Sequence, residues 1–185
     1  MPYRMSPGER GDAVVAAVYG LIAEAGTDAV TMRAIAGRVG ISVGTLANNF
    51  RYKAYLMKVV TFDIGRDLTR DLDWRTRRNG LEGFLPHSAD EVEAVGVWLA
   101  LRSLGRVSPE VGDQVEGIDA DQREMLRLCL QQLEDPPVRV ASTDPVVTRV
   151  WTLLQGLWME LSRPHATLTT EDARALLQAT VEARA

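Results

Sequence analysis

The chain has 185 residues, enough for one large domain or two small ones, and 46% of them are hydrophobic, which excludes a largely disordered protein. Its net charge of −4 excludes a wholly basic nucleic-acid-binding coat, but the charge is unevenly divided. Residues 1–58 carry seven Lys and Arg against four Asp and Glu, whereas residues 59–185 carry fourteen against twenty-one. A small basic part on an acidic body predicts contact with phosphate at one end only.

The single cysteine and the longest apolar run both indicate a cytoplasmic protein. Cys129 cannot form an internal disulfide and lies on an apolar helix face, as a buried thiol in a reducing compartment does. The apolar run at 13–23 is too short to span a bilayer, and acidic residues precede it, unlike in a signal peptide. We therefore expect a cytoplasmic location and no membrane partner.

The predicted elements at the start of the chain are three helices. Apolar residues recur at helical spacing over roughly 7–25. Thr31 is a candidate N-cap for the second helix, and Gly40 can end that helix in the left-handed conformation. Ser42 then caps a short third helix over about 43–49, which has so few apolar residues that it must pack against the first two.

The rest of the chain is also predicted to be helical, without strands, repeats or low-complexity segments. A long helix over about 52–78 is followed by a break at the glycines and proline of 79–86, and Ser88 or Asp90 can start the next helix. The expected fold class is all-α, with about nine helices. The later helices begin near Ser108, with an interruption near Gly117, then at Asp144, and at Thr169 with Asp172 completing a capping box.

The second and third helices have the arrangement of a helix-turn-helix motif, in which the second helix of the pair lies in the major groove of DNA. Gly44 has no side chain to hold the backbone away from DNA. Short polar side chains such as Thr45 and Asn48 offer donors and acceptors to base edges and phosphates, while Leu46 and Phe50 face the core. The alternative is that these are two short helices of an ordinary bundle with solvated asparagines.

The segment TMRAIAGRVGISVGTLANNFRYKAYL, residues 31–56, resembles the DNA-binding domain of TetR-family repressors, and the resemblance extends over about residues 10–60. It implies that polar residues near helix N-termini bind phosphates and that the third helix approaches bases. The DNA-binding residues implied in this way are Thr31, Arg33, Ser42, Val43, Gly44, Thr45, Asn48, Asn49, Arg51, Tyr52 and Lys53.

Two positions depart from the family pattern. Family members usually carry Tyr where this chain has Ala47, and they tend to carry a capping residue where it has Tyr52. Loss of the Tyr hydroxyl removes one phosphate contact, worth about 1–3 kcal/mol if nothing replaces it. Arg51 or the Tyr52 hydroxyl is a candidate replacement.

A monomer reads too few bases for useful specificity, so we expect a homodimer on palindromic half-sites of double-stranded DNA. Apolar residues of the helix over about 144–162 recur at spacings of 4, 3, 4 and 3, which predicts a seam for another helix. The alternative is a core within one chain. The predicted dimer interface consists of Val147, Trp151, Leu154, Trp158, Leu161, Ala173, Leu177 and Val181.

Segments 97–101, 150–161 and 169–179 resemble the C-terminal domain of choline-responsive bet-operon repressors in the same family. This resemblance implies a pocket enclosed by the middle helices, in which an unknown small-molecule effector shifts the spacing of the two DNA-reading parts. For each candidate singly, core packing is the alternative role. The candidate effector-binding residues are Phe62, Trp98, Met125, Trp151, Gln155 and Trp158.

No catalytic or cofactor motif is present in the sequence. His87 and His165 lack partners at metal-ligand spacing, so we expect no metal site, no cofactor and no enzyme activity. Residues 1–52 are predicted to form the DNA-binding domain and residues 53–185 the ligand-binding and dimerisation domain. The alternative function is a ligand-binding or protein-interaction module whose DNA binding is weakened by Ala47.

Overall fold

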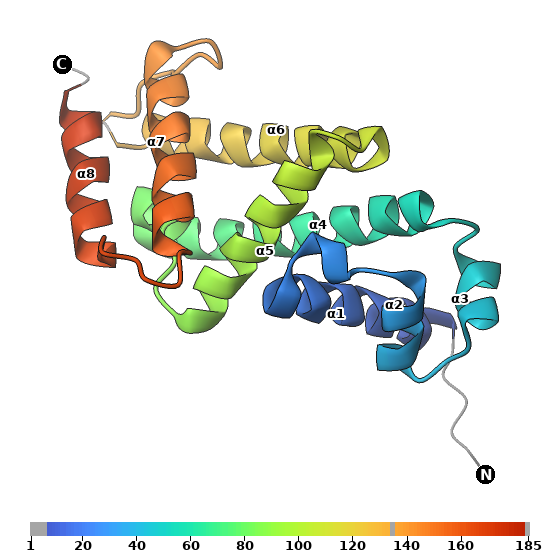
Figure 1. Cartoon of the computed structure of the whole chain (residues 1–185). Coiled ribbons are helices and arrows are strands. Elements are labelled where there is room, and N and C mark those ends of the chain that lie inside the picture. The colour runs from blue at the N-terminus through green and yellow to red at the C-terminus, as the bar shows by residue number, and fades with distance from the viewer. Residues whose placement is uncertain (1–6, 134–135, 184–185) are drawn as a thin grey trace. The chain divides into compact units, whose positions relative to one another are not determined.

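The computed structural model describes residues 7–133 and 136–183, and in these ranges the chain forms helices and no strand (Figure 1). This confirms the predicted all-α class, with eight α-helices and two short 3-10 helices in the described ranges. The elements are α1 (Pro7–Ala25), η1 (Thr27–Ala29), α2 (Met32–Val39), α3 (Val43–Asn49), α4 (Lys53–Asn79), η2 (Gly80–Phe84), α5 (Ala89–Gly105), α6 (Pro109–Gln131), α7 (Pro145–Leu161) and α8 (Thr170–Glu182).

The predicted helix ends are confirmed where a side chain caps them. The Oγ atom of Ser88 accepts a hydrogen bond from the amide of Glu91 at 3.2 Å, at the start of α5. Asp144 caps α7, and Thr169 and Asp172 form the predicted capping box of α8. These side chains satisfy amides that a helix N-terminus leaves without an intrahelical partner.

The expected interruption near Gly117 is wrong, because α6 runs without a break through this position. Gly117 is exposed, and a Cβ atom there would meet nothing within 4 Å. The neighbouring Val115 and Ile118 are buried, and this burial offsets the roughly 1 kcal/mol that a helical glycine costs relative to alanine.

The chain divides into two compact units, of which the first comprises residues 1–66 and 97–116 and the second residues 67–96 and 117–185. In the first unit α1 packs on α2, and α2 packs on α3. Val18, Ile35 and Leu46 are fully buried there. The predicted domain boundary at 52/53 coincides with the start of α4 and stays a prediction.

In the second unit α7 and α8 lie side by side (Figure 1). The turn that contains η2 is fastened to both of these helices. The indole Nε1 of Trp158 donates to the carbonyl oxygen of Phe84 at 2.7 Å, and Arg174 forms an ion pair with Glu82 at 2.9 Å. Gly83 is required in this turn, because a Cβ atom there would lie 2.5 Å from the backbone nitrogen of Thr76.

A buried arginine with two carboxylate partners also fixes this turn. The Arg75 side chain donates from Nη1 to the carbonyl oxygen of Leu85 at 3.0 Å and to Glu91 at 2.8 Å, and its Nε atom pairs with Asp71 at 3.0 Å. A guanidinium this deeply buried needs such partners, since an uncompensated buried charge is strongly destabilising. The turn between α4 and α5 is therefore held by both of the helices that it joins.

Candidate nucleic-acid interface

Three local signals shape the turn between α2 and α3. Thr31 caps α2, with its Oγ1 atom accepting from the amide of Ala34 at 3.1 Å. Gly40 ends α2 in the left-handed region with φ 75°, as predicted, and so turns the chain without strain. Ser42 then caps α3 by accepting from the amide of Thr45 at 3.0 Å. The helix-turn-helix geometry thus follows from residues of the turn itself.

The short helix α3 is held to its unit mainly by one side chain. Leu46 is completely buried, whereas Phe50 at the end of the helix is half-buried. Val43, the apolar residue that begins the helix, is 45% exposed. Because only one face of α3 is covered, its remaining surface is available to a partner.

The structure places the eleven predicted DNA-binding residues on the surface of the first unit. Ten are exposed and Thr45 is half-buried. The amide nitrogen of Asn49 donates to the carbonyl oxygen of Thr45 at 2.9 Å, which orients this side chain on the end of α3. Of these residues, Thr31 and Arg33 lie at the N-terminus of α2, Ser42 to Asn49 lie at the start and along α3, and Arg51 to Lys53 lead into α4.

A salt bridge joins the helix-turn-helix motif to α1. Arg38 at the end of α2 forms a salt bridge with Glu24 of α1, and the hydrogen bond between them lowers the pKa of Glu24 and raises that of Arg38. Gly20 of α1 leaves room for this guanidinium, since a Cβ atom there would lie 2.6 Å from its Nη1. Arg38 therefore fastens α2 to α1.

Three aromatic rings gather where α3 gives way to α4. The ring centroid of Tyr55 lies 6.5 Å from that of Phe50 and 6.2 Å from that of Tyr52. Both tyrosines are largely exposed, at 57% for Tyr52 and 44% for Tyr55. The sequence analysis did not include Tyr55 among the site residues. The pattern that could have identified it is an aromatic residue three positions after Tyr52, which is the spacing of neighbours on a helix.

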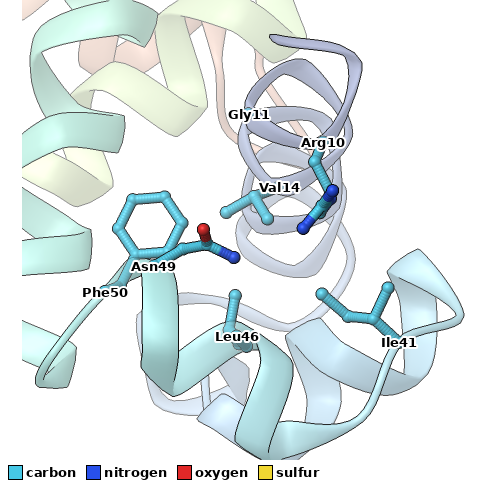
Figure 2. Close-up of a pocket in the computed structure, with 7 residues that line it drawn as sticks. All are labelled: Arg10, Gly11, Val14, Ile41, Leu46, Asn49 and Phe50. Atoms are coloured by element: carbon cyan, nitrogen blue, oxygen red, sulfur yellow. The ribbon is translucent and has the colours of Figure 1, made fainter. Parts of the chain in front are cut away.

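A pocket of about 200 Å³ opens beside α3, between this helix and the start of α1 (Figure 2). Its wall from α3 and the turns around it consists of residues already assigned to the motif. The sequence analysis did not predict that α1 forms the other wall of the pocket, although Arg10 and Val14 lie one helical turn apart in the basic part of the sequence. The lining residues are Arg10, Gly11, Val14, Ile41, Leu46, Asn49 and Phe50.

The predicted effector-binding residues are distributed over both units. Phe62, 44% exposed with the Arg66 guanidinium 5.7 Å from its ring, and Trp98, fully buried, belong to the first unit. The other four belong to the second unit, where Met125 is half-buried and Trp151 and Trp158 are buried.

On α7 the structure does group three of these candidates. Trp151, Gln155 and Trp158 follow one another at helical spacing, and the two indole rings meet edge to face with centroids 6.2 Å apart. Within the described residues, neither amide atom of Gln155 has a hydrogen-bond partner, although both atoms are buried. A buried polar group without a partner is unusual, and it marks this stripe for a ligand or an ordered water.

The predicted dimer seam lies inside the protomer. All but one of its eight side chains are buried, with exposed fractions of 8% or less, and Val181 is half-buried. The prediction that these residues contact a partner is therefore corrected: Val147, Trp151, Leu154, Trp158, Leu161, Ala173 and Leu177 form core between α7, α8 and the rest of their unit. The same 4, 3, 4, 3 spacing serves a neighbouring helix of the same chain.

The described part of the chain contains no cluster of His, Cys, Asp and Glu that could hold a metal ion. Over the same residues, no helix combines the length and the apolar character that crossing a membrane requires.

Comparisons with known proteins follow the two parts of the chain. Residues 14–60 match the family model described as bacterial regulatory proteins, tetR family. Residues 75–185, more than half of the chain, match the model of the BetI-type transcriptional repressor, C-terminal. No curated protein sequence matches the chain.

Solved structures share the fold at low sequence identity. A transcriptional regulator from Rhodococcus sp. Rha1 is 17% identical with a TM-score of 0.79, over 94% of each chain. A regulator from Pseudomonas aeruginosa PAO1 is 20% identical with the same TM-score, over 98% of this chain and 92% of the other. A third, from Saccharomonospora viridis in complex with choline, is 18% identical with a TM-score of 0.76, over 95% and 96% of the two chains.

Proposed function

Because this chain belongs to the TetR family of bacterial transcriptional regulators, with a C-terminal part of the BetI type, we propose that it is a dimeric repressor released from its operator by a small-molecule effector. The observation that carries the proposal is the capped helix α3, covered on one face only and exposed at its small and polar residues. Its place of action is the cytoplasm, where the chromosome lies. The family consists of regulators, and we propose no catalytic activity.

On DNA, α3 enters the major groove, and the helix N-termini around it bind the flanking phosphates. Val43, Gly44 and Asn48 approach base edges, because they occupy the exposed face of α3. Thr31 and Lys53 bind phosphates from the first turns of α2 and α4, next to this face. Arg33, Ser42, Thr45, Asn49, Arg51 and Tyr52 complete the surface.

Ala47 lacks the hydroxyl with which the usual Tyr binds a phosphate, and Tyr52, one of the three aromatic residues where α3 gives way to α4, supplies this hydroxyl instead. Tyr52 is 57% exposed and lies against Tyr55, so its ring is held at the surface. We expect Tyr52→Phe and Arg51→Ala each to weaken operator binding, and Ala47→Tyr to restore the affinity of the Tyr52→Phe variant. Unchanged affinity in both single variants would refute this replacement.

The dimer forms through the exposed faces of α7 and α8, on the side away from the buried stripe. Met159 of α7 is 58% exposed and Leu176 of α8 is 46% exposed, and burying these apolar side chains against a partner would favour association. The small residues around them allow close approach of two helix pairs across a two-fold axis. The face consists of Thr152, Gly156 and Met159 of α7 and Leu176, Ala179 and Ala183 at and after α8.

This face gives a direct test of the dimer. We expect Met159→Asp to sediment as a monomer in analytical ultracentrifugation and to lose high-affinity operator binding, since one half-site alone is too weak. Leu133→Asp, which replaces a residue that is 46% exposed elsewhere in the same unit, is the matched control. A Met159→Asp protein that remains dimeric would exclude the face.

The effector binds in the BetI-type part, with Gln155 as its polar contact between Trp151 and Trp158. The unpartnered buried amide of Gln155 supports this assignment, and a relative of the same fold was solved with choline. A thermal-shift screen that includes quaternary amines tests it, because a specific ligand must raise the melting temperature. The Gln155→Leu variant should lose the response to whichever compound the wild type binds.

DNA reading itself is tested by selecting duplexes from a random library with the purified protein. Recovery of a palindromic sequence whose binding weakens steeply with salt supports the repressor. The alternative function, a ligand-binding or protein-interaction module with weakened DNA binding, predicts a specific ligand in the thermal-shift screen and no selected sequence. That result would refute the repressor proposal.

A further inference from the structure

The pocket beside α3 has an apolar interior and a polar opening. Val14 of α1 and Leu46 of α3 are almost completely buried, and the rings and branched side chains of Phe50 and Ile41 complete the apolar walls. Figure 2 shows Arg10 reaching from α1 and Asn49 reaching from α3 toward the same space. The pocket therefore offers a cation and an amide above a nonpolar surface.

This combination fits the sugar–phosphate backbone of DNA. A guanidinium and an amide N–H are the donors that proteins use for phosphate oxygens, and a deoxyribose ring presents carbon atoms to apolar walls. The amide of Asn49 is already oriented by its bond to the carbonyl oxygen of Thr45, and its second N–H hydrogen can reach another acceptor. A volume of about 200 Å³ admits a phosphate together with part of a sugar.

We infer that this pocket receives one sugar–phosphate unit of the operator backbone at the edge of the major groove, with Arg10 as the phosphate-binding residue. The inference rests on the proposed reading of DNA by α3. It adds α1, which lies outside the helix-turn-helix pair, to the DNA-binding surface. Each half-site then gains one phosphate contact beyond those of α2, α3 and α4.

Removing the charge of Arg10 tests the contact through the salt dependence of binding. Each phosphate contact contributes about 0.9 to the slope of log K against log salt concentration, so Arg10→Gln should lower the slope of the dimer by about 1.8 and weaken binding about tenfold or more. The probe is the duplex selected by the wild-type protein. Arg10→Lys should retain the slope, because the positive charge remains.

A matched control separates this contact from the change in net charge. Arg106, which is exposed in the same unit, lies outside the pocket, and Arg106→Gln removes the same charge. We expect Arg106→Gln to keep the wild-type slope. Equal slopes for Arg10→Gln and the wild type would overturn the inference, as would equal losses in Arg10→Gln and Arg106→Gln.

A second variant fills the pocket instead of removing its charge. A Cβ atom at Gly11 would meet nothing within 4 Å, so Gly11→Leu can project into the pocket without displacing backbone. The protein should keep or raise its melting temperature, because leucine favours the helix, and should bind the selected duplex about tenfold or more weakly. Gly117→Leu, at an exposed helical glycine of the second unit, is the control and should bind normally.

The outcomes distinguish this inference from the proposed function. A wild-type protein that selects no duplex refutes the reading of DNA as a whole. A wild-type protein that selects a duplex, together with Gly11→Leu and Arg10→Gln proteins that bind it with unchanged affinity and slope, overturns the phosphate site alone. Binding of benzoate that Gly11→Leu abolishes, without any effect of this variant on DNA affinity, would assign the pocket to a small carboxylate and overturn the inference too.

Discussion

Gly44 provides a sharp test of the DNA-binding surface, because its substitution separates stability from DNA affinity. A Cβ atom at this position would contact only the Oγ of Ser42, at 3.7 Å, which is an ordinary van der Waals distance. Gly44 lies within α3 and has no positive φ. Gly44→Ala should therefore stabilise the free protein by about 0.5–1 kcal/mol, which corresponds to about 1–4 °C in melting temperature for a chain of this length.

The same methyl group should weaken DNA binding. If the backbone of α3 approaches bases or phosphates at Gly44, the added methyl overfills a close-packed contact, at a cost of about 1–3 kcal/mol for each half-site. The expected loss for the dimer is at least tenfold in Kd, since tenfold corresponds to about 1.4 kcal/mol. The variant should thus be more stable and a weaker DNA binder.

The assay is fluorescence anisotropy with the selected duplex, at fixed salt, paired with thermal unfolding of the free protein. Gly117→Ala is the matched control, because this glycine is also helical and exposed, and a Cβ atom there meets nothing within 4 Å. It should gain similar stability and bind DNA normally. A Gly44→Ala protein with wild-type Kd would refute the close approach of α3 at this residue.

Three further predictions concern the second unit. Trp158→Phe should lower the free energy of unfolding by about 2–4 kcal/mol in urea titrations, because it leaves the buried Phe84 carbonyl without its donor and opens a small cavity. The control is Trp74→Phe at an exposed position, which should change the free energy of unfolding by less than about 0.5 kcal/mol. Equal effects would argue against the hydrogen bond. Burial raises the pKa of the Cys129 thiol, so iodoacetamide at pH 8 should alkylate the native protein at least about tenfold more slowly than the urea-unfolded chain, and equal rates would contradict this. Hydrogen bonds from the hydroxyl and the backbone amide of Thr169 lower the pKa of Asp172. The stability advantage of the wild type over Asp172→Ala should therefore be present above the ordinary carboxyl pKa of 3.8 and lost as the pH falls below it. An advantage that stays constant from pH 7 to pH 3 would exclude this linkage.

Local features of this fold could be predicted from the sequence, because their causes lie within a few residues. Thr31, Gly40 and Ser42 determine the turn of the motif through caps and a left-handed glycine, and each does so in the structure as expected. The exposure of α3 followed from the same reasoning. A seven-residue helix with one buried side chain, Leu46, has most of its surface left for a partner.

Features that depend on tertiary packing could not be predicted from the sequence. The stripe from Val147 to Leu161 has the spacing of a helix seam, but spacing does not say whether the opposing helix belongs to the same chain or to a partner. Its burial within the protomer decides this, and it moves the expected dimer contacts to the face with Met159. The pocket with Arg10 was missed because it exists only where α1 packs beside α3.

The distribution of the four tryptophans allows the intrinsic fluorescence of the protein to report on its interior. Trp98, Trp151 and Trp158 are buried, whereas Trp74 is 58% exposed with the Arg78 guanidinium 4.7 Å from its ring. A collisional quencher such as acrylamide should reach Trp74 first, and replacing it with Phe would leave emission from the interior alone. In that background, a change in emission on adding an effector would report on the buried tryptophans, two of which lie on the α7 stripe, without any attached dye.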